Sequence, residues 1–272
     1  MASTPSKVQT ANEILLERAI RHSVYLARFR TQVGNEMVGA LEPLLARVFA
    51  KVTRAADGIQ SRGLTVSSKS RRSIQNLLVS LSAELGITYR TLRQNLGKEM
   101  RALAKAEGAW QTLALRESVP GGIGIAFTAP KASLLNSVVD GRPMILGTRS
   151  GFVKDFFDEM PRSFLRDIEG TVNAAMRNGE TTRDVARRLT GTRGSAGVLG
   201  KARRDLLTVS RTVVNHVGNQ ARELAYASNP DVVKGVKFIA TLDARTSGIC
   251  RSLDGDDAGR FELWMGDQII PR

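Results

Sequence analysis

The sequence predicts a mostly α-helical fold with a small α+β module at the C-terminal end. Apolar residues recur at steps of three and four over residues 11–106 and again over 152–227, the pattern of amphipathic helices. A short apolar run flanked by turn residues follows residue 235, where it predicts a strand. Apolar residues make up 42% of the 272 and aromatic residues only 5%, which suits a folded, helix-rich chain.

The first apolar stripe, from Ile14 to Val52, predicts one amphipathic helix or two in series. Pro43 lies inside it and predicts a break or the first turn of a second helix, because an interior proline removes a backbone donor and clashes with the preceding turn. The arginines on the opposite side of the helix are expected to face solvent, and the alternative is that they bind nucleic acid. These arginines are Arg18, Arg21, Arg28, Arg30 and Arg47.

After a loop at residues 58–69, the helical period resumes over 70–106. Gly86 is predicted to interrupt it, with Thr88 capping the second half. Residues 1–109 are therefore expected to form a helical hairpin or bundle, whose stripes must pack on each other or on a partner subunit.

Glycine and proline punctuate residues 110–150, which predicts a connector with short strands before a final module at 151–272. Within that module, helices are expected up to residue 178, from Thr181 to Gly191, and over 202–227. The short middle helix is similar to the first helix of a helix-turn-helix, but the turn and recognition helix of that motif do not follow.

Lysine and arginine total 40 against 26 aspartates and glutamates, a formal net charge of +14. Such a surplus attracts polyanions, foremost nucleic acid, although an anionic membrane surface or an acidic protein would satisfy the same charge. A single cysteine excludes an internal disulfide and a multi-cysteine zinc site. No apolar signal core or membrane-length apolar window is present, so a soluble protein made in the cytoplasm is expected.

The strongest basic segment is residues 185–204, which carries six basic residues, no acidic residue and four glycines. A mobile, purely basic loop can follow a phosphate backbone whatever its base sequence, so the segment predicts non-specific binding of double-stranded DNA. A surface loop without a ligand is the alternative. The predicted DNA-binding residues are Arg187, Arg188, Arg193, Lys201, Arg203 and Arg204.

The run from Lys237 to Leu242 leads into an acid, an arginine and a threonine, then a glycine turn, the single cysteine and a second turn. This pattern resembles the signature of the Mu F-like head-morphogenesis proteins, the minor head proteins of tailed bacteriophages. The matching positions are Asp243, Arg245, Thr246, Cys250, Leu253, Asp254 and Gly255.

The resemblance implies a non-enzymatic minor head (capsid) protein that acts in head assembly and in genome packaging or delivery. It implies several copies inside the virion head, after assembly in the host cytoplasm. The expected partners are the portal protein and double-stranded DNA, with the major capsid or scaffolding protein as further candidates. No catalytic residue, metal or cofactor is expected.

Two other classes stay open. A metal-dependent nucleic-acid-processing enzyme is one, because clustered carboxylates can hold magnesium, and a host-directed phage effector is the other. The carboxylates in question are Asp243, Asp254, Asp256 and Asp257.

Cys250 is expected to be a buried structural residue under the turn, with a nucleophile or a metal ligand as alternatives. In the structural interpretation, Asp243 and Arg245 form a charge-assisted pair that fixes the turn, and Thr246 caps it.

Overall fold

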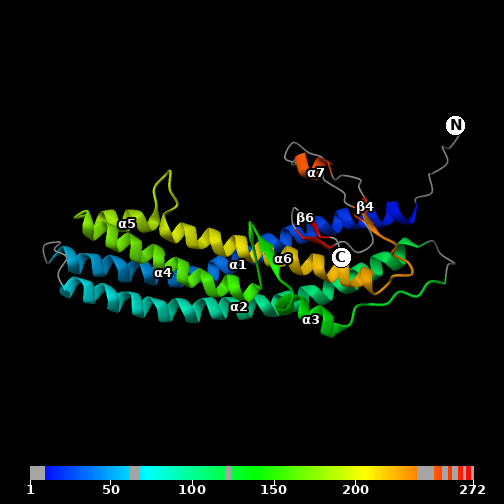
Figure 1. The fold of residues 1–272 in the computed structure, drawn as a ribbon, viewed down its shortest axis with the longest axis horizontal. Helices are drawn as coiled ribbons and strands as arrows, with labels where there is room; N and C mark the ends of the chain where they lie inside the picture. Colours follow the sequence, from blue (N-terminus) through cyan, green and yellow to red (C-terminus); the bar gives the residue numbers. More distant parts are fainter. Residues whose placement is uncertain are drawn as a thin grey trace.

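The chain folds into an elongated bundle of long helices that run side by side (Figure 1). This computed structural model describes residues 10–61, 68–119, 124–237, 248–252, 257–258, 263–265 and 268–270. The mostly α-helical fold class predicted from the sequence is confirmed, as is the N-terminal helical hairpin. That hairpin consists of α1 (Ala11–Gln60) and α2 (Ser68–Ser118).

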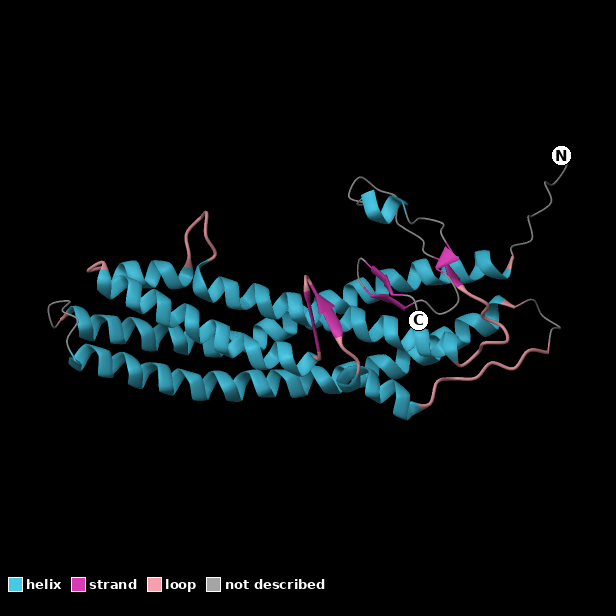
Figure 2. Ribbon diagram, viewed as in Figure 1, coloured by secondary structure: helices cyan, strands magenta, loops and turns pink. Residues whose placement is uncertain are grey.

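The following elements fold back along this hairpin (Figures 1 and 2). They are α3 (Ala132–Gly141), the antiparallel strands β1 (Met144–Leu146) and β2 (Arg149–Gly151), then α4 (Val153–Arg177), α5 (Thr182–Thr190) and α6 (Gly197–Ala227). In Figure 1, α4 and α5 lie along the half of the bundle where α1 ends and α2 begins. Helix α6 runs back from there toward the N-terminal half of α1.

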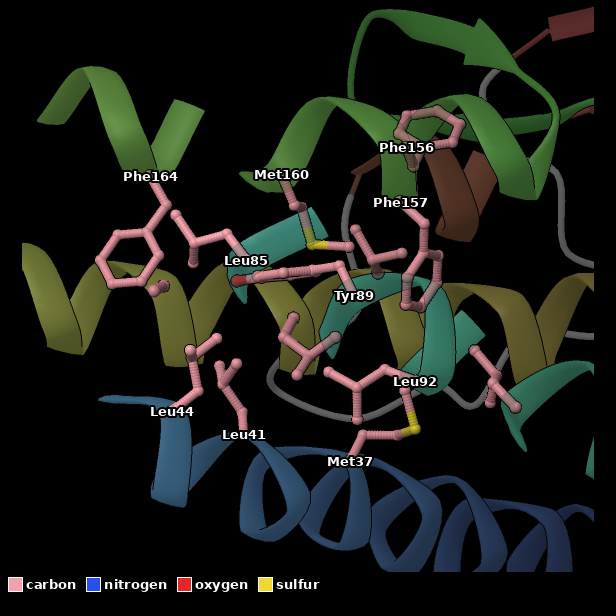
Figure 3. Packing of buried hydrophobic residues seen from close by; sticks show 14 of the residues in the cluster. Met37, Leu41, Leu44, Leu85, Tyr89, Leu92, Phe156, Phe157, Met160 and Phe164 are labelled. Atoms are coloured by element: carbon pink, nitrogen blue, oxygen red, sulfur yellow. The ribbon is translucent and has the colours of Figure 1, made fainter. Parts of the chain in front are cut away.

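One continuous apolar core joins α1, α2, α4 and α6. Figure 3 shows its centre, where side chains from three of these helices meet. They are Met37, Leu41 and Leu44 of α1, Leu85, Tyr89 and Leu92 of α2, and Phe156, Phe157, Met160 and Phe164 of α4. Full burial of one such apolar side chain stabilises the fold by about 1.5–3 kcal/mol, so the N-terminal hairpin depends on the later helices that cover it.

The predicted break at Pro43 is wrong, because α1 continues through it. An interior proline costs a helix roughly 3 kcal/mol. Leu41, Leu44 and Leu45 around it are no more than 1% exposed, and their combined burial exceeds that cost.

The predicted interruption at Gly86 is also wrong, because α2 is continuous from Ser68 to Ser118. A helical glycine costs only about 1 kcal/mol relative to alanine, and Leu85 and Tyr89 beside it are buried. Helix α2 also passes beyond Trp110, and its last turns are held by Leu115, which is 6% exposed.

The helix ends in the second half of the chain follow their capping residues. Helix α4 ends at Arg177 with Asn178 as its C-cap, and Gly179 follows with a φ of 63°. Thr181 caps α5 in a reciprocal box with Asp184, as predicted. Helix α6 begins at Gly197 rather than at residue 202, because the glycines before it close a turn and start the helix early.

The small C-terminal α+β module is confirmed in outline. Strand β3 (Val236–Lys237) pairs antiparallel with β4 (Asp257–Ala258), and β5 (Leu263–Met265) pairs with β6 (Gln268–Ile270). The short helix α7 (Gly248–Ser252) carries the backbone of Cys250. The other signature positions lie outside the described residues: Asp243, Arg245, Thr246, Leu253, Asp254 and Gly255.

Within the described part of the chain, no helix combines the length and the apolar character that a membrane crossing requires.

Gly197 tests whether the turn before α6 is as closely packed as the structure indicates. Its φ is 62°, and a Cβ there would lie 2.3 Å from the backbone nitrogen of Gly191. We expect Gly197→Ala to lower the free energy of unfolding by about 2 kcal/mol or more, since the left-handed conformation alone costs an L-residue roughly 1–2 kcal/mol. Urea-induced unfolding measures the change.

Gly170→Ala is the matched control, because Gly170 lies in α4, where an added Cβ would meet no neighbouring side chain or other helix within 4 Å. It should raise the free energy of unfolding by about 1 kcal/mol. Equal stabilities of the two variants would contradict the close turn.

Candidate nucleic-acid interface

The basic segment 185–204 is a helix corner rather than a loose loop. It comprises the end of α5, a turn at residues 191–196 and the start of α6, and the turn projects from the bundle in Figure 1. Thr192 N donates to Ser195 O at 2.7 Å, and Ser195 N donates to Thr192 O at 3.1 Å. A Cβ on Gly191 would lie 2.1 Å from Ser195 O. Gly191 and Gly197 thus permit a tight closure in place of the long glycine-rich loop expected from the sequence.

Arg203 connects this corner to the first helix. Its Nε donates to Glu42 Oε1 at 2.5 Å, and its Nη2 donates to Glu42 Oε2 at 2.8 Å. The hydrogen bond from Arg203 holds the pKa of Glu42 below its usual range, against a smaller opposing effect of burial. A forked pair of this kind fixes both side chains, so Arg203 joins α6 to α1.

Arg188 makes a similar forked contact with Glu180, at the junction of α4 and α5. Its Nε donates to Glu180 Oε2 at 2.7 Å, Nη2 binds the other oxygen, and Asn178 Nδ2 donates to the same carboxylate at 3.0 Å. These hydrogen bonds, Arg188 first, lower the pKa of Glu180 to about 2. Arg188 therefore stabilises the bend between the helices.

The remaining four residues divide by how firmly they are held. Lys201 Nζ lies 2.7 Å from Asp167 Oδ2 of α4, whereas Arg187 is 3.8 Å from Asp184 and more than half exposed. Arg193 and Arg204 are exposed and have no carboxylate within 4 Å among the described residues. The cations of this corner that are available to an anion are thus Arg193, Arg204 and the loosely paired Arg187.

The internal partners were missed in the sequence because the segment itself contains no acid. Asp184 stands just before it, three residues from Arg187 on the same helix, so that pair carried a local signal. Glu180 is eight residues from Arg188 and lies before α5 begins, so that pair did not. Glu42 is 161 positions from Arg203, and nothing local indicates that pair.

A second polar cluster was also missed, and it lies between α1, α2 and α6. Glu107 is 1% exposed; His22 Nε2 lies 2.7 Å from its Oε1, and Arg222 Nε lies 3.3 Å from its Oε2. The His22 ring stacks on Trp110 with centroids 3.7 Å apart. Each carboxylate oxygen has a partner from another helix, so the cluster ties three helices together.

The described residues contain no group of three or more histidine, cysteine or acidic side chains that could hold a metal ion. No family model, curated protein or solved structure matches the chain. The fold and the corner define an elongated helical-bundle protein with Arg187, Arg193 and Arg204 exposed where α5 meets α6.

The pairing of Glu180 predicts a specific acid sensitivity. Its folded pKa of about 2 lies below the ordinary glutamate value of about 4.3. A carboxyl with a depressed folded pKa contributes stability that is present above the unfolded pKa and is lost as the pH falls through the folded pKa. We expect stability to fall between about pH 4.5 and pH 2 more steeply in the wild type than in Glu180→Gln.

Urea unfolding at a series of pH values measures this difference. Glu169→Gln, which changes an exposed glutamate of α4 without a basic partner within 4 Å in the described ranges, is the control and should follow the wild type. Parallel curves for the wild type and Glu180→Gln would rule out the pairing.

Proposed function

We propose that the protein is a minor head protein of a tailed bacteriophage, acting in head assembly and in genome packaging or delivery without catalysing a reaction. The observation that carries this proposal is the spacing of the C-terminal signature. Asp243, Arg245 and Thr246 precede a glycine turn, Cys250 follows, and Leu253 begins the closing Leu-Asp-Gly. The proposal places the protein inside the virion head near the portal, after assembly in the host cytoplasm.

The charge of the molecule supports a position beside packaged DNA. The formal net charge is +14, large enough to concentrate a polyanion by long-range attraction. At the α5–α6 corner, Arg193 and Arg204 have no carboxylate partner among the described residues, and Arg187 is held only weakly. Exposed cations of this kind bind phosphates without reading base edges, so double-stranded DNA is the proposed non-specific ligand.

A salt titration tests this DNA contact. Removing Arg193 and Arg204 together should flatten the plot of log affinity against log salt by roughly 0.9 per lost phosphate contact. The loss should be equal on two duplexes of unrelated sequence. Changing Arg90 and Lys98 of α2 to alanine removes the same charge from exposed positions elsewhere and serves as the control.

An unchanged slope in the Arg193/Arg204 variant, or a strong preference for one duplex, would exclude the corner as the contact. If the protein cleaves the duplex and EDTA abolishes the cleavage, the protein is a metal-dependent nucleic-acid-processing enzyme instead.

The N-terminal part of α1 has a face that the other helices of the bundle do not cover. The apolar stripe of α1 is buried from Val33 onward, whereas Ile20 is 56% exposed and Val24 is 50% exposed. We propose that this outer face meets the portal, with the major capsid or scaffolding protein as further partners in the head.

Mass spectrometry of purified DNA-filled heads tests the function as a whole, and we expect intact copies of the chain in them. Ile20→Ser combined with Val24→Ser should leave folding intact, since both side chains are exposed, but should reduce incorporation. If the wild-type chain is absent from the heads and acts elsewhere in the host cell, the protein is a host-directed phage effector. Normal incorporation of the double variant would exclude this face of α1.

A further inference from the structure

Helices α1 and α6 meet along a narrow seam at Gly34. A Cβ on Gly34 would lie 2.7 Å from Leu207 Cδ1 and 3.4 Å from both Cγ and Nε of Arg211, so the Arg211 side chain crosses the backbone of α1. One turn earlier in α1, Arg30 Nη1 lies 3.4 Å from Asn215 Oδ1. Asn215 is one turn beyond Arg211 in α6, and therefore the two arginines occupy adjacent positions across the seam.

Each of these two arginines has a buried donor nitrogen without an acceptor. Both side chains are half-buried, and the Nε of each is buried without a hydrogen-bond partner. Neither has a carboxylate within 4 Å in the described portion of the chain, whereas Arg203 and Arg222 of the same helix each meet a glutamate. Buried donors are normally paired, and leaving a charged one unpaired is costly.

The two guanidinium groups of the seam favour a ligand with several anionic oxygens. A guanidinium is always charged at ordinary pH and offers its donors in a planar fork that matches phosphate oxygens. Two such forks, on different helices, supply more donors than one planar carboxylate can accept in a single geometry. Asn215 points its oxygen toward Arg30, which leaves its amide N–H groups as further donors.

We propose that the seam of Arg30, Arg211 and Asn215 is a binding site for a phosphate group. It is separate from the α5–α6 corner and does not depend on a role in the phage head. Arg204 stands seven residues before Arg211 in α6, roughly 10 Å along the same helix face. A phosphodiester chain can therefore reach both, and a free phosphate can occupy the seam alone.

Titration calorimetry with inorganic phosphate, at constant ionic strength set with chloride, tests the site. We expect Arg30→Gln and Arg211→Gln each to weaken binding about tenfold or more, because each removes charge-assisted hydrogen bonds. Arg28→Gln is the control: it makes the same charge change at an exposed position of α1 that has no carboxylate within 4 Å among the described residues. Its affinity should match the wild type.

A parallel titration with a short DNA duplex identifies the source of the phosphate. Phosphate binding that is lost in both seam variants supports a free phosphate ligand. If the wild type binds the duplex but not inorganic phosphate, and the seam variants lose duplex binding while Arg28→Gln keeps it, the ligand is a phosphodiester. Thermal unfolding in chloride shows whether each variant folds, and Arg211→Met keeps the apolar stem if Arg211→Gln does not fold.

The site is overturned if the seam variants bind both ligands as the wild type does, or if Arg28→Gln loses as much affinity as they do. Either result leaves the head-protein proposal untouched, because that proposal is tested on particles.

Discussion

The architecture depends on the burial of a helix face that is too long for one neighbour to cover. The stripe of α1 from Val33 to Ile59 is buried by α2 on one side and by later helices on the other. Apolar side chains from all six helices α1 to α6 fill a single core, and each contributes through the removal of apolar surface from water. This constraint overrides local preferences, which is why Pro43 and Gly86 lie within continuous helices.

Charge in this protein serves two separate purposes. Part of the charge of the basic segment holds helices together through acids of other elements, as Arg203 does with Glu42 and Lys201 with Asp167. The charge of Arg193 and Arg204 at the α5–α6 corner has no acid partner within 4 Å among the described residues and is free to meet an external anion. A basic segment therefore indicates ligand contact only where its cations lack internal partners, and the structure separates Arg193 and Arg204 from the rest on that ground.

The helical periodicity predicted the fold class, the N-terminal hairpin, the end of α4 and the cap of α5 at Thr181, because these follow from contacts within a few residues. Sequence reasoning failed where distant parts of the chain decide the outcome. The closed turn at Gly191 and Gly197 depends on their mutual approach, and the partners of Arg203 and Glu107 come from other helices. The signature from Asp243 to Gly255 lies mostly outside the described residues, so its prediction stays a prediction.

The cluster around Glu107 gives the two ends of α1 different physical characters. No residue of α1 before Val33 is buried among those described, and this end is attached through Arg18 to Glu117, through His22 to Glu107, and by the partly buried Leu26 and Phe29. The opposite end is attached mainly by apolar packing from Val33 to Ile59, with the Arg203–Glu42 pair added to it. Dissolved ions screen the exposed Arg18–Glu117 pair far more than the buried Glu107 contacts, and cooling weakens apolar packing. Salt and temperature therefore act on different contacts along a single helix.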